Sequence, residues 1–143
     1  MTKLLAIESS CDETACAIVE NGNIILSSVV SSQINVHTLY GGVVPEVASR
    51  IHVENISAVI KQALQDAQLS MDDIDGLTYT LGPGLIGSLH VGVTAAKTLA
   101  YAFHKPLIPV NHMTGHIYAN RFALDHDLQF PLLALVISGG HSQ

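Results

Sequence analysis

The chain has 143 residues, of which 48% are hydrophobic and 13% are charged, and its formal net charge is −6. This length accommodates one domain or part of one, and this composition excludes an intrinsically disordered chain. The six Lys and Arg residues, set against twelve Asp and Glu, form no basic stripe. These residues alone therefore do not predict a surface that grips nucleic acid.

The first residues, MTKLLAIESS, contain one Lys and a short apolar run that Glu8 interrupts. This run is too short for a signal peptide, and no later run reaches the length of a membrane span. We therefore expect a cytoplasmic protein without a membrane partner. Cys11 and Cys16 form neither a C-x-x-C pair nor a disulfide framework, so we interpret them as reduced thiols with no catalytic role.

The N-terminal part of the chain predicts three antiparallel strands. Apolar runs at residues 4–7 and 15–19 flank the polar turn SSCDET, a pattern typical of two buried strands joined by a short loop. Asn21-Gly22 then predicts a type I′ hairpin turn, because both central residues of that turn need positive φ. A third strand is expected over 23–30.

Helices and strands alternate in the remainder of the chain. Beyond Gly41-Gly42, Pro45 can begin a helix whose apolar residues recur at helical spacing up to about Gln68. The later segments continue the alternation, with a strand over 75–81, a helix over 89–103, a strand over 106–110 and a helix from 112 onward. The order β-β-β-α-β-α-β-α indicates an α/β fold with a mixed sheet flanked by helices.

The C-terminal residues, PLLALVISGGHSQ, repeat the pattern of the N-terminal KLLAIESSCDET, in which a Leu-Leu-Ala strand leads into a polar turn of small residues. This echo falls where a second copy of the first lobe would begin. We therefore expect residues 1–130 to form the first lobe of a two-lobed protein. Residues 131–143 would then form the first strand and the phosphate-type loop of a second lobe, which is truncated.

LGPGLIG places Gly82, Gly84 and Gly87 after a strand and before a helix, which is the context of a dinucleotide-binding fingerprint. That fingerprint also expects an acidic residue about 20 positions later. The chain reads KPLIPVN there and has no acidic residue. We favour a structural interpretation, in which the glycines allow a tight turn and a closely packed helix.

The turns SCDET and SGGHSQ each follow a Leu-rich strand and offer small side chains and backbone amides, a geometry that suits phosphate. Facing each other after a duplication, two such turns would form the kind of cleft in which actin-like and hexokinase-like folds hold ATP. Asp12 and Glu13 add carboxylates that can serve a metal or proton transfer, or that form a solvated acidic turn.

His112 and His116 are four residues apart, a spacing that places both imidazoles on one face of a helix. The spacing alone leaves metal binding and a structural role equally open. The position of the pair just after a strand favours a ligand site. A zinc protease of the H-E-x-x-H type is disfavoured, because Met113 occupies the position of the glutamate that acts as general base.

Five motifs together resemble, in order and spacing, the N-terminal half of the tRNA threonylcarbamoyladenosine transferases, the TsaD family: IESSCDET, GGVVPEVASRIHVEN, LGPGLIGSLHVG, NHMTGHIYA and SGGHSQ. The resemblance spans the chain and implies one lobe of an actin/hexokinase-like (ASKHA) fold. It also implies that the full-length protein transfers a threonylcarbamoyl group from threonylcarbamoyl-AMP to N6 of adenosine 37, in tRNAs that read ANN codons. The fragment alone should be inactive.

The resemblance also implies roles for particular residues. His112 and His116 would bind one divalent metal ion, iron or zinc, with a third ligand, an Asp, beyond Gln143. Asp12 and Glu13 are our candidates for the catalytic carboxylates, and ATP is a further possible ligand of the fold. The loop that binds the adenylate-type substrate would consist of Val136, Ile137, Ser138, Gly139 and Gly140. Ser142 and Thr114 depart from the usual Thr and Glu of the family, and we expect little effect from either change.

The partners that the resemblance implies are tRNA, a smaller TsaB-like protein of actin fold and a TsaE-like ATPase. The helices at 50–67 and 88–103 would provide the protein interface, either with the TsaB-like partner or in a homodimer, through small residues that include Gly92 and Ala96. Two alternatives stay open. A catalytically silent scaffold paralogue would dimerise with the active enzyme and would not need the histidine pair. An actin-fold small-molecule kinase would carry an acidic catalytic residue in place of the histidine helix.

Overall fold

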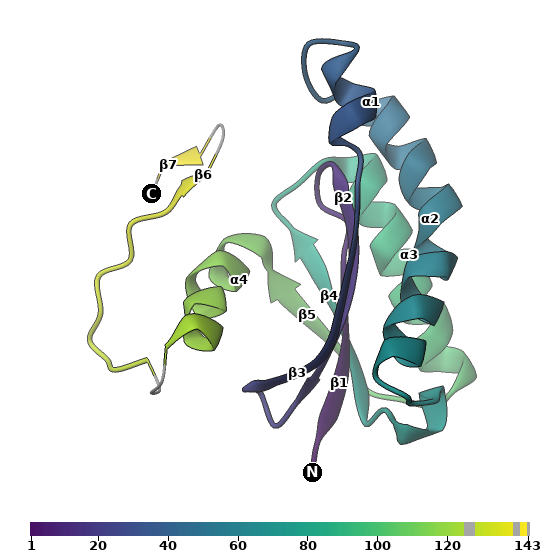
Figure 1. Ribbon diagram of the computed structural model, residues 1–143, viewed down its shortest axis with the longest axis vertical. Coiled ribbons are helices and arrows are strands. Elements are labelled where there is room, and N and C mark those ends of the chain that lie inside the picture. Colours follow the sequence, from purple (N-terminus) through teal and green to yellow (C-terminus); the bar gives the residue numbers. More distant parts are fainter. Residues whose placement is uncertain (125–127, 139–140, 143) are drawn as a thin grey trace.

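The computed structural model describes residues 1–124, 128–138 and 141–142, and its centre is a five-stranded mixed sheet in the order β3-β2-β1-β4-β5 (Figure 1). The first three strands form an antiparallel meander: β1 (Lys3–Glu8), β2 (Glu13–Glu20) and β3 (Ile24–Ser32). The other two, β4 (Gly76–Gly82) and β5 (Leu107–Asn111), run parallel to β1. The predicted mixed sheet is therefore confirmed.

Helices lie on both sides of the sheet. The two long helices, α2 (Pro45–Asp66) and α3 (Ile86–Ala102), pack side by side on one face, whereas α4 (His112–Ala119) leaves the sheet on the opposite side (Figure 1). No helix among the described residues is long and apolar enough to span a bilayer.

The hairpin turn between β2 and β3 has the predicted backbone, since Asn21 and Gly22 adopt φ values of 52° and 74°. The strands extend further than their apolar runs, because polar residues continue the ladder at each end. In particular, β2 begins at Glu13, so the polar turn after β1 spans only residues 9–12. Glu13 is thus a strand residue and not a turn residue.

Three short elements were not predicted: α1 (Ile34–Thr38), η1 (Met71–Asp73) and η2 (Asn120–Ala123). Helix α1 has no apolar stripe from which it could be recognised. Its buried residue is His37, whose Nε2 lies 2.9 Å from Oε1 of the buried Gln33. A polar contact therefore holds this helix, and hydrophobic periodicity does not report such contacts.

The core lies between the sheet and the pair of long helices. Leu5 and Ile7 of β1, Ile18 of β2 and Leu77 of β4 are buried against α2 and α3. The small residues of α3 also face this core, since Ala96 is 0% exposed. The expectation that Ala96 belongs to an external interface is therefore wrong, because its small side chain serves close packing of the helix on the sheet.

The glycine-rich segment around residues 82–92 has a packing role. A Cβ atom on Gly84 would lie 2.6 Å from the carbonyl oxygen of Ser10, and one on Gly92 would lie 2.4 Å from Oγ of Ser9. Both distances are shorter than real Cβ contacts, so no side chain fits without a shift of its neighbours. This confirms the structural interpretation of the glycine motif.

Ser9 connects β1 to α3 in an unusual way. Its hydroxyl donates to the carbonyl oxygen of Ser88 at 2.7 Å and accepts from the N–H of Gly92 at 3.1 Å. Residues 88 and 92 are the pair that a regular α-helix joins directly. The Ser9 hydroxyl therefore lies between two backbone groups that α3 would otherwise pair with each other. Residue 92 must be glycine, because a Cβ there would overlap this hydroxyl.

The C-terminal residues differ from the prediction. Short strands β6 (Ile137–Ser138) and β7 (His141–Ser142) pair antiparallel, but residues 131–136 form no strand. In the part of the chain that the structure describes, no neighbouring strand lies beside these residues, so their backbone groups cannot complete a ladder. The predicted lobe boundary at residue 130 stays a prediction.

We predict that Gly92→Ala lowers the free energy of unfolding by about 1–3 kcal/mol, because the new Cβ overpacks against Ser9. Gly115→Ala is the matched control: Gly115 is also helical, but a Cβ there meets nothing within 4 Å. The control should gain up to about 1 kcal/mol from helix propensity. Denaturant unfolding of both variants measures the difference.

A double-mutant cycle identifies the cause of this loss. In a Ser9→Ala background the oxygen closest to the new Cβ is gone, so Gly92→Ala should cost less than in the wild type. Equal costs in the two backgrounds would mean that Ser9 is not the obstacle.

Candidate functional site

The polar residues of the site gather where the three parallel strands end. Glu8 is the last residue of β1, Thr80 lies near the end of β4, and His112 directly follows β5. The strands are neighbours in the order β1-β4-β5, so their carboxyl ends meet at one edge of the sheet. Ligand sites of open α/β sheets lie at such an edge.

Helix α4 begins at this edge and presents the histidine pair. Its N-cap is Asn111, whose side-chain oxygen accepts hydrogen bonds from the N–H groups of Met113 at 2.9 Å and Thr114 at 3.2 Å. This cap satisfies amides that a helix start otherwise leaves unpaired. It fixes the direction of α4, and with it the position of His112 at the first turn.

The two imidazoles converge as their spacing predicts. Nε2 of His112 lies 3.0 Å from Nε2 of His116, and the ring planes are nearly perpendicular, at 87°. A neutral imidazole has one nitrogen that donates and one that accepts. The two Nε2 atoms, at this distance, therefore either share a hydrogen bond or face a common cation. The donor set therefore fits a divalent ion such as zinc or iron, which imidazole binds readily.

Glu8 lies behind His112. Its carboxylate accepts hydrogen bonds from the backbone N–H of Ser10 and from the hydroxyl of Thr80. Its Oε2 lies 3.4 Å from Nδ1 of His112, and Oγ of Ser10 lies 3.1 Å from the same nitrogen. Burial raises the pKa of Glu8, but the hydrogen bonds from Ser10 and Thr80 and the nearby His112 together hold it below its ordinary value. Glu8 is thus an ionised group that only accepts.

Within the described ranges, no group of three or more His, Cys, Asp or Glu side chains is arranged to hold a metal ion. Two convergent imidazoles, those of His112 and His116, are what the described part of the chain offers to a cation. The third ligand that the family resemblance implies falls on a residue beyond Gln143.

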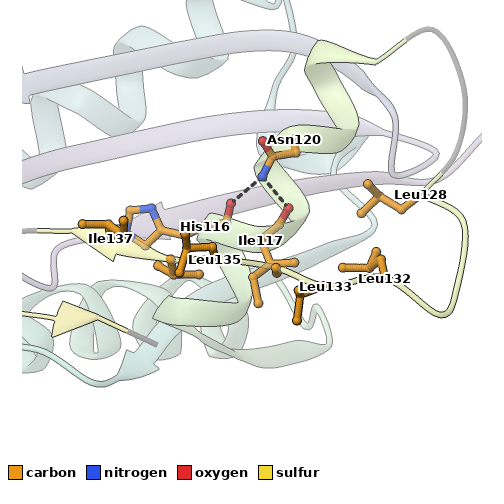
Figure 2. Close-up of a pocket in the computed structure, with 10 residues that line it drawn as sticks. His116, Ile117, Asn120, Leu128, Leu132, Leu133, Leu135 and Ile137 are labelled. Atoms are coloured by element: carbon orange, nitrogen blue, oxygen red, sulfur yellow. Dashed lines mark hydrogen bonds between the residues drawn. The ribbon is translucent and has the colours of Figure 1, made fainter.

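A pocket of about 570 Å³ opens beside His116 (Figure 2). Helix α4 contributes His116, Ile117 and Asn120 to it, and the extended C-terminal segment contributes residues 132–137. Asn120 donates to the carbonyl oxygens of His116 and Ile117, which closes the last turn of α4. Figure 2 shows His116 next to Leu135 and Ile137.

This pocket includes part of the predicted substrate loop. Val136 is half-buried and Ile137 is 73% exposed, and both line the pocket together with His116. Ser138 lies in β6, while Gly139 and Gly140 are outside the described residues. The structure therefore brings two of the five predicted loop residues beside α4, the helix that carries the histidine pair.

The predicted carboxylates occupy a separate position. Asp12 is half-buried beside a small pocket that includes His37 and Gly41, and Glu13 is exposed at the start of β2. In the described contacts, neither carboxylate forms a hydrogen bond or ion pair with His112 or His116.

The turn that carries Asp12 is held by buried polar groups. Nε2 of His52 donates to the carbonyl oxygen of Cys11 at 2.9 Å, and its Nδ1 lies 2.7 Å from Oγ1 of Thr14. The N–H of Gln33 donates to the carbonyl oxygen of Asp12 at 3.0 Å.

Sequence reasoning missed Glu8, Ser10 and Thr80. Each is a polar residue within two positions of the carboxyl end of a strand, which is a recognisable signal once the strands are known to be parallel neighbours. The order of elements along the chain does not state that β1, β4 and β5 are adjacent. The sheet topology supplies this information.

Known proteins resemble this chain over nearly its whole length. The family model for TsaD, tRNA N6-adenosine threonylcarbamoyltransferase, matches residues 24–143. Proteins with this name from Listeria monocytogenes serotype 4b and Staphylococcus saprophyticus are 59% and 60% identical over 142 residues. The alignments cover 99% of this chain and 41% of each relative, so the chain spans about two fifths of their length.

Two solved structures share the fold at low sequence identity. YeaZ from Pseudomonas aeruginosa superposes with a TM-score of 0.59 at 20% identity, over 78% of this chain and 44% of that one. RuvC of T. thermophilus, solved in complex with a Holliday junction substrate, gives 0.55 at 11% identity, over 92% of this chain and 85% of that one. These likenesses and the mixed sheet confirm the predicted actin/hexokinase-like fold.

The coverage of the relatives also agrees with the prediction that the chain is part of a longer protein. Because the family model matches most of the chain and the relatives are about 59% identical to it, the chain belongs to the TsaD family of tRNA N6-adenosine threonylcarbamoyltransferases.

Proposed function

We propose that the full-length protein transfers a threonylcarbamoyl group from threonylcarbamoyl-AMP to N6 of adenosine 37 in tRNAs that read ANN codons. Family membership supports this reaction class. The observation that carries the proposal for this chain is the convergence of His112 and His116 at the carboxyl ends of three parallel strands. The reaction would take place in the cytoplasm.

In this reaction the N6 amine of adenosine attacks the carbamoyl carbon. A bond between nitrogen and carbon forms, the bond between that carbon and a phosphate oxygen breaks, and AMP leaves. The amine proton must pass to a base. We assign this task, or the organisation of the phosphate region, to Asp12 and Glu13, and the buried contact of His52 would hold the turn in place for it.

His112 and His116 would hold one divalent ion, iron or zinc, through their Nε2 atoms. The bound ion would withdraw charge from the substrate during transfer. The residues of the chain would orient the substrate: Val136 and Ile137 line the pocket beside His116, and the adjoining Ser138, Gly139 and Gly140 would offer backbone amides to the phosphate or the carbamate.

The alternatives have less support. A silent scaffold paralogue would not need two imidazoles that converge at 3.0 Å on a sheet edge. An actin-fold kinase would need an acidic catalytic residue where α4 carries histidines. A metalloendopeptidase of the H-E-x-x-H type lacks its general base, because Met113 is at that position.

The same proposal divides the protein into lobes. Residues 1–130 would form the first lobe, and residues 131–143 would begin the second. The segment from Leu132 to Ile137 is largely exposed in this chain, with Leu133 at 99% and Leu135 at 77% exposure. A second lobe would cover these apolar side chains and provide the neighbouring strand that this segment lacks.

A surface for a protein partner lies on the other side of the sheet from α4. An open groove of about 690 Å³ runs between α2 and α3 and is lined mainly by apolar side chains. Val53, which is 63% exposed, and Thr94 lie along it, whereas Ala96 is buried and does not line it. We assign this groove to the TsaB-like partner, or to a homodimer in its absence. A TsaE-like ATPase and tRNA would complete the assembly.

We predict that the full-length His112→Ala, His116→Ala double variant loses its bound divalent metal, because both imidazole ligands are removed. Elemental analysis of the purified protein measures the metal content, and a transfer assay with tRNA and threonylcarbamoyl-AMP measures the activity. His104→Asn is the control: His104 is an exposed histidine with a positive φ of 52°, a conformation that Asn tolerates. Wild-type metal content in the double variant would show that the helix is structural.

We predict that Thr94→Arg weakens association with the TsaB-like partner at least tenfold, because the variant places an unpaired charge in an apolar groove. Tyr101→Arg is the matched control, since Tyr101 is on the same helix, is 85% exposed and does not line the groove. Titration calorimetry measures the affinity, and sedimentation detects a homodimer. If folded Thr94→Arg pairs as tightly as the wild type, the groove is not the interface.

A further inference from the structure

We infer that Glu8 is a positioning residue whose carboxylate holds His112 in the tautomer that directs a lone pair on Nε2 toward His116. The inference rests on the proposed metal site, because this tautomer is the one in which Nε2 can bind a cation. It adds to the site a residue that lies 104 positions from His112 in the sequence.

Glu8 can orient His112 because its own carboxylate is held in place. Oε1 accepts from the backbone N–H of Ser10, and Oε2 accepts from the hydroxyl of Thr80 on the neighbouring strand. Thr80 is in β4, and Ser10 is in the turn directly after β1. Oε2 of Glu8 is therefore fixed, and the ring of His112, on a helix that starts at the same edge, takes the tautomer that suits this oxygen.

The chemistry of the two groups selects the tautomer. A carboxylate only accepts, so a favourable contact requires that Nδ1 of His112 carries the hydrogen. Oε2 lies 3.4 Å from Nδ1, which is longer than an ordinary hydrogen bond, but the ionised oxygen still attracts an N–H and repels a lone pair. Ser10 does not decide the tautomer, because its hydroxyl, 3.1 Å away, can donate or accept.

The tautomer then determines what the pair of histidines can do. With hydrogen on Nδ1, Nε2 of His112 accepts, and Nε2 of His116 at 3.0 Å donates to it. A divalent cation can take the place of that shared proton. Ligand histidines commonly donate their second N–H to a carboxylate, and the loss of such a partner typically lowers metal affinity about 10–100-fold.

The test compares variants of the full-length protein in two measurements. Competition with a chromophoric chelator gives the Kd for Zn²⁺, and nitrogen NMR of labelled histidine in the metal-free protein reports the tautomer of His112. Glu8→Ala should weaken zinc binding about 10–100-fold and shift His112 toward the form with hydrogen on Nε2. Glu8→Gln, which keeps an oxygen acceptor, should lie between wild type and Glu8→Ala in both measurements.

Two controls separate orientation from general stability. Glu20→Ala removes a carboxylate at the opposite edge of the sheet, where the backbone of Glu20 is in register with that of Lys3, and should leave both measurements unchanged. Thr80→Val removes one hydrogen bond of Glu8 but no atom that contacts His112. Because Ser10 still holds Oε1, Thr80→Val should weaken zinc binding less than Glu8→Ala and should keep the Nδ1–H form of His112. Equal losses in the two variants would contradict orientation of the ring by the Glu8 carboxylate.

Retention of zinc affinity within twofold and of the Nδ1–H form in folded Glu8→Ala would overturn the inference. If the wild-type protein binds no zinc or iron, the proposed metal site fails. The tautomer of His112 in metal-free wild type and Glu8→Ala then still decides whether Glu8 orients the ring. The two failures are therefore distinguishable.

Discussion

The site depends on the insertion of the Ser9 hydroxyl between the carbonyl of Ser88 and the amide of Gly92. This contact joins the end of the central strand to the first turns of α3, and the absence of a side chain at Gly92 makes it sterically possible. Gly84 approaches the backbone of Ser10 in the same way. These contacts fix the backbone at the end of β1, and they therefore fix the backbone of Glu8, the last residue of this strand.

A fixed Glu8 carboxylate can orient the first histidine of α4. The N-cap at Asn111 sets the direction of α4, and the carboxylate of Glu8 faces Nδ1 of its first residue, His112. Helices α2 and α3, whose side chains line the proposed partner groove, lie on the other face of the sheet (Figure 1). A partner bound there would leave the histidine pair open to substrate. It would contact α3, which packs on β1, the strand that ends in Glu8.

The turn between β1 and β2 shows a second form of rigidity. Thr14, Gln33, His37 and His52 are buried polar residues, and each forms a hydrogen bond with a protein group. Satisfied networks of this kind specify one arrangement, because a shift would leave buried groups unpaired. Asp12 thus has a defined backbone position although its carboxylate belongs to a surface turn. A fixed backbone position suits the proton-transfer role that we propose for Asp12.

Local patterns in the sequence determined the order of the five sheet strands and of α2, α3 and α4, the hairpin at Asn21-Gly22 and the common face of His112 and His116, because each depends on residues a few positions apart. Tertiary structure decided which strand ends meet. Parallel pairing of strands that are distant in the chain placed Glu8 beside His112. Packing of α3 on the sheet placed the Ser9 hydroxyl against the backbone of α3 and buried Ala96 in the core. The tertiary structure also left residues 131–136 without a ladder, since a strand needs a partner that its own sequence cannot supply.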